Sequence, residues 1–155
     1  MSREVMVCAA QMGPNSESKE ENIERMISMV QEAGKKGVDI ICFPECALTP
    51  FFTLENSRDF DQYLDTLPNE ITEKLFEETK NHKMAMVLPY AERTPHCNYN
   101  SAVISNRNGE IIGNYRKAHL PGAFVGDAVG NSEKLYFTPG NTGFPVFDLG
   151  FAKVG

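Results

Sequence analysis

The fold class is decided by the stretch Val38-Asp39-Ile40-Ile41-Cys42-Phe43-Pro44-Glu45. Its first six residues form a short apolar run that is rich in β-branched side chains, and such a run predicts a buried strand. Pro44 ends this strand because proline has no amide hydrogen to donate to a neighbouring strand. Glu45 therefore follows the carboxyl end of a strand, which is where open α/β sheets bind their ligands.

Strand and helix patterns alternate on both sides of this stretch. A buried strand is expected over residues 5–11, and a helix from Glu20 to Gly34–Gly37, because apolar side chains recur there at helical spacing. A second helix is expected over 69–82 and a further strand over 84–90. Later patterns predict a hairpin and two short strands at 100–105, 110–116, 145–149 and 152–155. The order β-α-β-α-β-β-β indicates an α/β fold in which a sheet is layered against helices.

Composition excludes several classes of protein. Of the 155 residues, 41% are hydrophobic and 23% are charged, which is ordinary for a globular domain. The net charge of -6, with Lys35–Lys36 as the only adjacent basic pair, argues against nucleic acid or an anionic membrane as a partner. No apolar stretch is long enough to span a bilayer, and residues 5–10 are too short for a secretory signal. We therefore expect a cytoplasmic protein.

The cysteines give no sign of a metal site or of disulfides. Cys8, Cys42, Cys46 and Cys97 form no Cys-x-x-Cys pair, and His96 next to Cys97 is the only His/Cys neighbour pair. Reduced thiols are expected in a chain without a secretory signal. We interpret each cysteine as a small buried hydrophobic residue, and we predict that none of them is a nucleophile or a metal ligand.

Four ionisable residues are candidates for catalysis or substrate binding. Glu45 is flanked by apolar residues, which disfavour its ionised form and make it the more basic group that a general base requires. Lys117 closes a predicted strand, where a cation can stabilise a developing oxyanion. His119 would bind a substrate carboxylate or cap the loop, and Glu133 precedes the aromatic segment 134–137. Each also has a simpler interpretation as a solvated charge, so these residues alone do not define an enzyme.

Together, the segments around these residues resemble the nitrilase superfamily of carbon–nitrogen hydrolases. The similar segments are 38–45, 115–117 and the residues around Glu133, and Gln11 and Asn100–Ser101 also match the pattern. The resemblance implies a nitrilase-type α-β-β-α sandwich that is truncated here to roughly its first half. The whole chain, 1–155, would then be the N-terminal part of a single carbon–nitrogen hydrolase domain.

Within the superfamily, the N-carbamoyl-D-amino-acid hydrolase group is the most similar. The segments that carry this likeness are 47–52, 116–122 and 143–148. Enzymes of this group release a free amino acid, carbon dioxide and ammonia without a metal or an organic cofactor. The resemblance also implies a small-molecule carbamoyl or amide substrate and a homo-oligomer, either a dimer or a tetramer. One departure is Asn131, which stands where the group usually has a histidine.

The resemblance gives each candidate residue a role. Glu45 would be the base that activates a cysteine, and Lys117 would stabilise the tetrahedral intermediate. Glu133 would orient Lys117 and assist proton transfer, while His119 would contact the substrate carboxylate. The nucleophilic cysteine of the family would lie a few residues beyond Gly155, so residues 1–155 alone are expected to be inactive.

Two kinds of alternative stay open. Another branch of the superfamily, such as an amidase, a nitrilase or a carbamoylputrescine hydrolase, fits the same motifs. A non-catalytic α/β interaction module would keep the fold without the chemistry. The catalytic interpretation makes a geometric prediction. The ammonium of Lys117 should lie within about 4 Å of a carboxylate oxygen of Glu45 or Glu133, and the three head groups should line one pocket beside Gly155.

Overall fold

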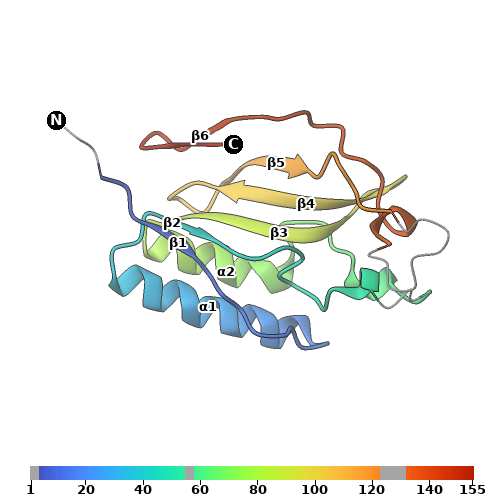
Figure 1. Cartoon of the computed structure of the whole chain (residues 1–155). Coiled ribbons are helices and arrows are strands. Elements are labelled where there is room, and N and C mark those ends of the chain that lie inside the picture. Colours follow the sequence, from blue (N-terminus) through green and yellow to red (C-terminus); the bar gives the residue numbers. More distant parts are fainter. Residues whose placement is uncertain (1–3, 55–57, 123–131) are drawn as a thin grey trace.

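The computed structural model describes residues 4–54, 58–122 and 132–155. Its central element is a five-stranded sheet (Figure 1). The strands lie side by side in chain order: β1 (Val7–Ala9), β2 (Ile40–Cys42), β3 (Ala85–Arg93), β4 (Asn98–Ser105) and β5 (Ile111–Arg116). β1, β2 and β3 are parallel to one another, whereas β4 is antiparallel to both β3 and β5. β5 therefore runs in the same direction as β2, and the carboxyl ends of these two strands point to the same edge of the sheet.

Two helices cover one face of the sheet, α1 (Lys19–Lys35) and α2 (Glu70–Asn81) (Figure 1). The Ser18 side chain caps α1 by accepting a hydrogen bond from the amide of Glu21. α2 begins with a capping box, in which Asn69 and Thr72 each accept a hydrogen bond from the other's amide. Among the described residues, no helix is both long enough and apolar enough to cross a membrane.

A short hairpin lies over the opposite face of the sheet (Figure 1). It consists of β6 (Phe147–Asp148) and β7 (Lys153–Val154), which pair antiparallel. The Phe147 ring packs against Gly113 of β5 so closely that a Cβ atom on that glycine would lie 2.0 Å from the ring. The described chain therefore has three layers, with helices on one side of the five-stranded sheet and a two-stranded sheet on the other.

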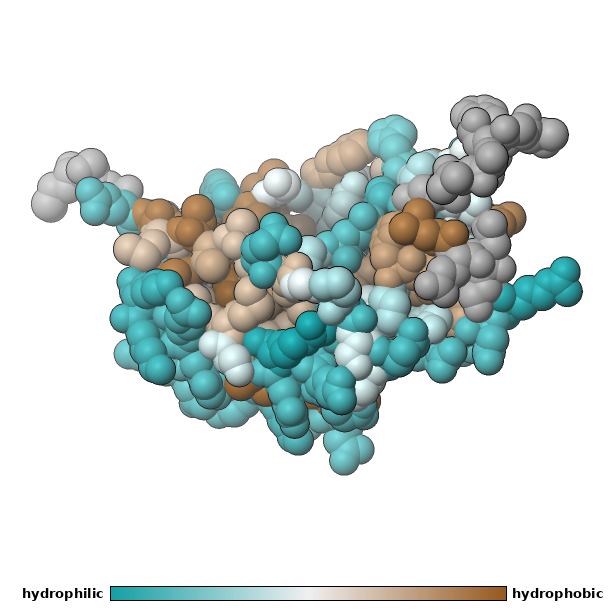
Figure 2. Space-filling view, turned by 60° about the horizontal axis from the view of Figure 1, so that its bottom comes forward, coloured by the Kyte–Doolittle hydropathy of each residue, from teal (hydrophilic) through white to brown (hydrophobic). Residues whose placement is uncertain are grey.

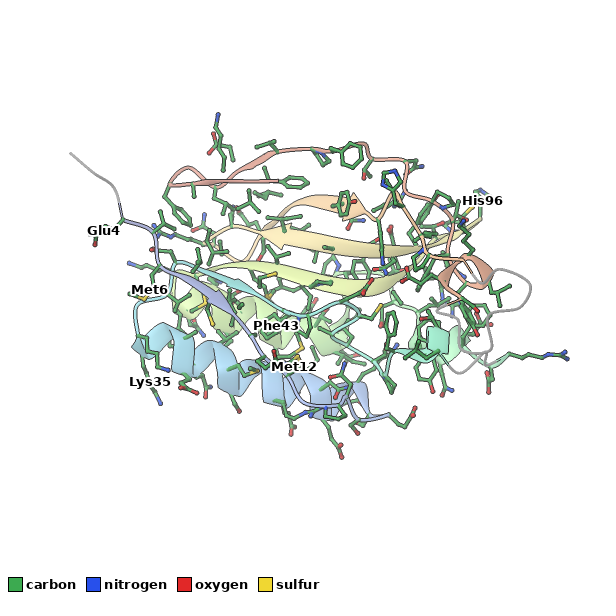
Figure 3. The ribbon with its side chains drawn as sticks, in the orientation of Figure 1. Glu4, Met6, Met12, Lys35, Phe43 and His96 are labelled. Atoms are coloured by element: carbon green, nitrogen blue, oxygen red, sulfur yellow. The ribbon has the colours of Figure 1, made fainter. Side chains whose placement is uncertain are left out.

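The main hydrophobic core fills the space between the helices and the sheet. Its fully buried members include Met26, Val30, Leu75 and Leu88, each 0% exposed. Phe43, which follows β2 directly, lies between the sheet and the helices and is 2% exposed (Figure 3). Burying one such side chain stabilises the fold by roughly 1.5–3 kcal/mol. This core therefore fixes the end of β2, from which Glu45 projects.

A second core lies beneath the loops at the carboxyl ends of the strands. Phe52, in the 3-10 helix η1 (Phe52–Leu54), is at its centre, with its ring 5.1 Å from Tyr63 and 5.2 Å from Tyr136, measured between centroids. Tyr63 belongs to η2 (Asp61–Tyr63), and Tyr136 follows η3 (Glu133–Leu135). This aromatic cluster joins three loops that are far apart in the sequence.

The expected order of strands and helices is confirmed, but two expectations about burial are wrong. β1 is an edge strand rather than a buried one, because Val7 is 70% exposed and Met6, just before it, is 50% exposed. Figure 2 shows hydrophobic residues on the surface next to the grey atoms at its left. Cys42 is exposed, because its side chain points to the face of the sheet that the helices do not cover.

Only Cys46 fits the interpretation of the cysteines as buried hydrophobic residues. It is 1% exposed, whereas Cys8 and Cys97 are partly exposed.

The sequence analysis did not predict the hairpin between β3 and β4. β3 continues to Arg93, beyond the predicted end at residue 90, because Thr94 and Cys97 close a turn through their backbone and the Thr94 hydroxyl.

Candidate active site

Glu45 lies three residues after the end of β2, in a turn that backbone contacts hold in place. The amides of Phe43 and Ala47 donate to carbonyl oxygens of β3, each at 3.1 Å, so both ends of the turn are tied to the sheet. Cys46 adopts a φ of 50°, a left-handed conformation that residues other than glycine rarely take up. Surrounding contacts must hold such a backbone in place. The turn therefore presents Glu45 in one direction, with 44% of its side chain exposed.

Lys117 directly follows β5, and backbone contacts hold it on both sides. Its amide donates to the carbonyl of Asn100 in β4 at 2.8 Å, and its own carbonyl accepts from the amide of Gly140 at 2.9 Å. A Cβ atom on Gly140 would lie 2.0 Å from the carbonyl oxygen of Arg116, so only glycine permits this close approach. The Lys117 backbone is therefore clamped between β4 and the segment around Gly140.

Glu133 is the first residue of η3, and its side chain is completely buried. Its carbonyl accepts hydrogen bonds from the amides of Tyr136 at 3.0 Å and Phe137 at 2.9 Å. Both of these aromatic rings pack against Phe52 in the second core. The packing of these rings against Phe52 therefore positions the Glu133 carboxylate over the carboxyl ends of the strands.

These three elements bring the three charged side chains together. The ammonium nitrogen of Lys117 lies 2.8 Å from Oε1 of Glu45 and 2.9 Å from Oε1 of Glu133. Two residues separated by 72 positions thus form an ion pair, and a third joins it across a loop. The predicted distance limit is confirmed for both carboxylates.

The environment keeps Lys117 positively charged. Partial burial acts to lower the pKa of its ammonium, but the hydrogen bonds from the ammonium to Glu45 and Glu133 outweigh burial and raise the pKa above its ordinary value. The cluster therefore holds a cation between two carboxyl groups. Such a cluster contains both a proton acceptor and a cation that can face developing negative charge.

The structure gives less about the other predicted features of the site. His119 is exposed and its ring stacks on Phe144 with centroids 6.3 Å apart; no hydrogen bond joins it to the three charged residues within the described ranges. Asn131 lies outside the described residues. Glu45 lines a cleft of about 400 Å³, whereas Gly155 lines a different one of about 590 Å³. A single pocket that holds the three head groups beside Gly155 stays a prediction.

A second polar network lies directly behind the cluster, and sequence reasoning missed it. The Arg116 guanidinium binds the Glu92 carboxylate through two hydrogen bonds of 2.6 and 2.8 Å, and Ser101 donates a third at 2.6 Å. Glu92 is only 7% exposed. The signal in the sequence was the pair Asn100–Ser101, two adjacent polar residues inside a buried strand, since buried polar groups require partners.

No metal site is found in the part of the chain that the structure describes, and the thiol next to Glu45, Cys46, is buried. No three His, Cys, Asp or Glu side chains there are grouped so that they could hold a metal ion. His96 lies exposed at the turn between β3 and β4 (Figure 3). Burial, above all, raises the pKa of the Cys46 thiol, and the carboxylates of Glu45 and Glu133 raise it further. Cys46 is therefore held in its unreactive protonated form.

Comparison with known proteins identifies the family. Residues 6–155 match the family model described as carbon-nitrogen hydrolase, so this chain belongs to the carbon–nitrogen hydrolase family.

Solved structures have the same fold as this chain. A carbon-nitrogen hydrolase from Helicobacter pylori G27 superposes with a TM-score of 0.73 at 24% identity, covering 90% of this chain and 46% of that one. An amidase from Nesterenkonia sp. superposes with a TM-score of 0.75 at 17% identity, covering 99% of this chain and 55% of that one. The fold is the nitrilase-type α/β fold.

Curated relatives carry several names. A citrullinase from Francisella tularensis is 34% identical over 153 residues, 97% of this chain and 51% of that protein. An N-carbamoylputrescine amidase from Arabidopsis thaliana is 34% identical over 159 residues, 99% of this chain and 50% of that protein. A beta-ureidopropionase from the same plant is 34% identical over 134 residues, 84% of this chain and 32% of that protein. The chain thus spans about half the length of the first two relatives and a third of the last.

Proposed function

We propose that this chain supplies the base, the lysine and the second carboxylate of a hydrolase that cleaves non-peptide carbon–nitrogen bonds in carbamoyl or amide compounds. The observation that carries the proposal is the position of the Lys117 ammonium, in contact with Glu45 and with the buried Glu133. An unrelated surface lysine gains little from two such partners. A cation fixed beside a base is what acyl transfer requires.

The two oxygens of Glu45 have different surroundings, which suits a base. Within the described residues, the hydrogen bonds that reach this carboxylate come from Lys117 and Asn100, and both end on Oε1. Oε2 is then the atom that accepts a proton. Because 44% of the side chain is exposed, an incoming thiol can approach it.

The proposed reaction proceeds in two steps through a thioester. A cysteine thiol attacks the carbonyl carbon while its proton moves to Oε2 of Glu45, and Lys117 faces the negative charge that forms on the carbonyl oxygen. Collapse breaks the carbon–nitrogen bond, and the departing nitrogen takes the proton from Glu45. Water then adds to the thioester and gives a proton to Glu45. The carbon–sulfur bond breaks, and Glu45 returns that proton to the sulfur, which regenerates the thiol and the base.

The nucleophilic cysteine of this proposal comes from the part of the relatives' length that these 155 residues do not cover. Cys46 is buried and protonated, and no hydrogen bond joins any thiol to Glu45 in the described residues. Residues 1–155 would then form the N-terminal part of a single hydrolase domain.

For the whole protein, we also propose that it is cytoplasmic and forms a homo-oligomer.

The finer substrate assignment is also a proposal. N-carbamoyl-D-amino acids are the first candidates, with His119 contacting the substrate carboxylate from its exposed position after Lys117. Carbamoylated amines and ureido acids are the alternatives, because relatives at 34% identity are named N-carbamoylputrescine amidase and beta-ureidopropionase. Nitriles are a further alternative, because a relative from Pyrococcus abyssi that is also 34% identical is named nitrilase.

Ammonia release by the full-length protein tests the proposal. N-carbamoyl-D-phenylalanine, N-carbamoylputrescine, 3-ureidopropionate, butyramide and a simple nitrile would be compared as substrates. Glu45→Gln should lower kcat by at least about a hundredfold, because it keeps the shape of the side chain and removes the proton acceptor. Glu24→Gln, the same change on the exposed side of α1, is the control and should leave kcat unchanged. Turnover that survives Glu45→Gln would refute the role of Glu45, and absence of turnover on every substrate would favour a non-catalytic module.

A further inference from the structure

Asn100 touches all three charged residues of the cluster. It lies in β4 and is 4% exposed. Its side-chain nitrogen donates to Oε1 of Glu45 at 2.5 Å and to Oε2 of Glu133 at 3.2 Å. Its backbone carbonyl accepts from the amide of Lys117 at 2.8 Å. Asn100 therefore joins the cluster to β4, an interior strand of the sheet.

The chemistry of a side-chain amide explains why asparagine suits this place. Its nitrogen carries two N–H donors and no acceptor, so it can bind two carboxylates at once without titrating. Buried donors must be satisfied, so the amide fixes the position of one oxygen on each carboxylate. On Glu45 that oxygen is Oε1, which Lys117 also contacts, and this leaves Oε2 to face the reacting thiol.

We propose that Asn100 is a positioning residue that orients Glu45 and Glu133 around Lys117, a role that rests on the function proposed above. It acts through these carboxylates and does not itself touch the substrate. An aspartate at this position has the same shape but would set a third carboxylate against Glu45 and Glu133. A serine would keep a single donor.

Kinetics of the full-length protein provide the first test. Asn100→Asp should lower kcat about a hundredfold while KM changes by less than about threefold, because misorienting the base affects the reacting geometry more than binding. The acid side of its pH–rate profile should move to higher pH, because the added negative charge disfavours ionisation of the base. Asn100→Ser should lose less activity and show a smaller shift. Asn108→Asp, which adds the same charge in the exposed turn between β4 and β5, is the control and should match the wild type.

NMR provides a second test that does not depend on turnover. The side-chain amide resonances of Asn100, assigned by their loss in Asn100→Ser, should shift in Glu45→Gln, whereas those of Asn108 should not. This result would support the bridging contact even if the wild type hydrolysed none of the substrates, an outcome that would count only against the proposed function. Unshifted Asn100 resonances would overturn the positioning role, and so would an active Asn100→Asp variant whose pH profile superimposes on that of the wild type.

Discussion

Replacing Lys117 with methionine tests how much the charged cluster contributes to stability. The change keeps most of the length of the side chain and removes its charge, so Glu133, which is 0% exposed, loses its ion pair with Lys117. Breaking a buried ion pair by removing one partner costs about 3–5 kcal/mol. The cost should fall at the lower end, about 3 kcal/mol, because Lys117 is 30% exposed and water screens its interactions. For a protein of this size, that corresponds to a decrease in Tm of roughly 6–12 °C.

Urea and thermal unfolding, followed by circular dichroism, would measure the effect. Adding Glu133→Gln to Lys117→Met should recover most of the lost stability, because the buried negative charge is then gone. Glu45→Gln is the matched comparison, and it should cost no more than about 1 kcal/mol because 44% of that side chain is exposed. A Lys117→Met variant as stable as the wild type would refute this account of the cluster. A double variant that is no more stable than Lys117→Met would do so as well.

Three further predictions follow from neighbouring contacts. Gly140→Ala should destabilise the protein by about 1–3 kcal/mol and reduce kcat, because the new methyl group meets the Arg116 carbonyl beside the lysine; unfolding curves and ammonia release would measure both effects. A thiol reagent should label exposed Cys42 in the native state but label buried Cys46 only on unfolding, as peptide mapping would reveal. Burial acts to raise the pKa of Glu92, but its hydrogen bonds to Arg116 and Ser101 lower it below the ordinary 4.5. Stability should therefore decline as the pH falls below about 4.5, and Arg116→Lys should weaken that pH dependence in acid unfolding curves.

Local patterns in the sequence predicted the order of helices and strands, although not the hairpin between β3 and β4. The helix over Lys19–Lys35 follows from apolar residues at helical spacing, and the end of β2 follows from Pro44, because both effects act over a few neighbouring residues. Burial was harder to predict. Residues 5–11 read as a buried strand, yet Val7 is 70% exposed, because exposure depends on whether a second layer covers that face of the sheet.

The candidate site shows the same division between local and tertiary information. Resemblance to a family selected Glu45, Lys117 and Glu133 from the sequence, whereas their individual chemistry left each as an ordinary solvated charge. The tertiary structure decided that they meet. β2 and β5 end at the same edge of the sheet, and the aromatic cluster around Phe52 draws Glu133 back over that edge.

The sequence by itself therefore determined the type and order of the elements and the family, because these depend on local spacing and on motifs that can be read along the chain. Only the tertiary structure decided which oxygen of Glu45 is engaged, that Asn100 bridges both carboxylates, and that Arg116 binds Glu92 beneath them. Each of these contacts joins residues at least 24 positions apart. Whether such residues meet depends on strand register and core packing, which no local stretch of sequence encodes.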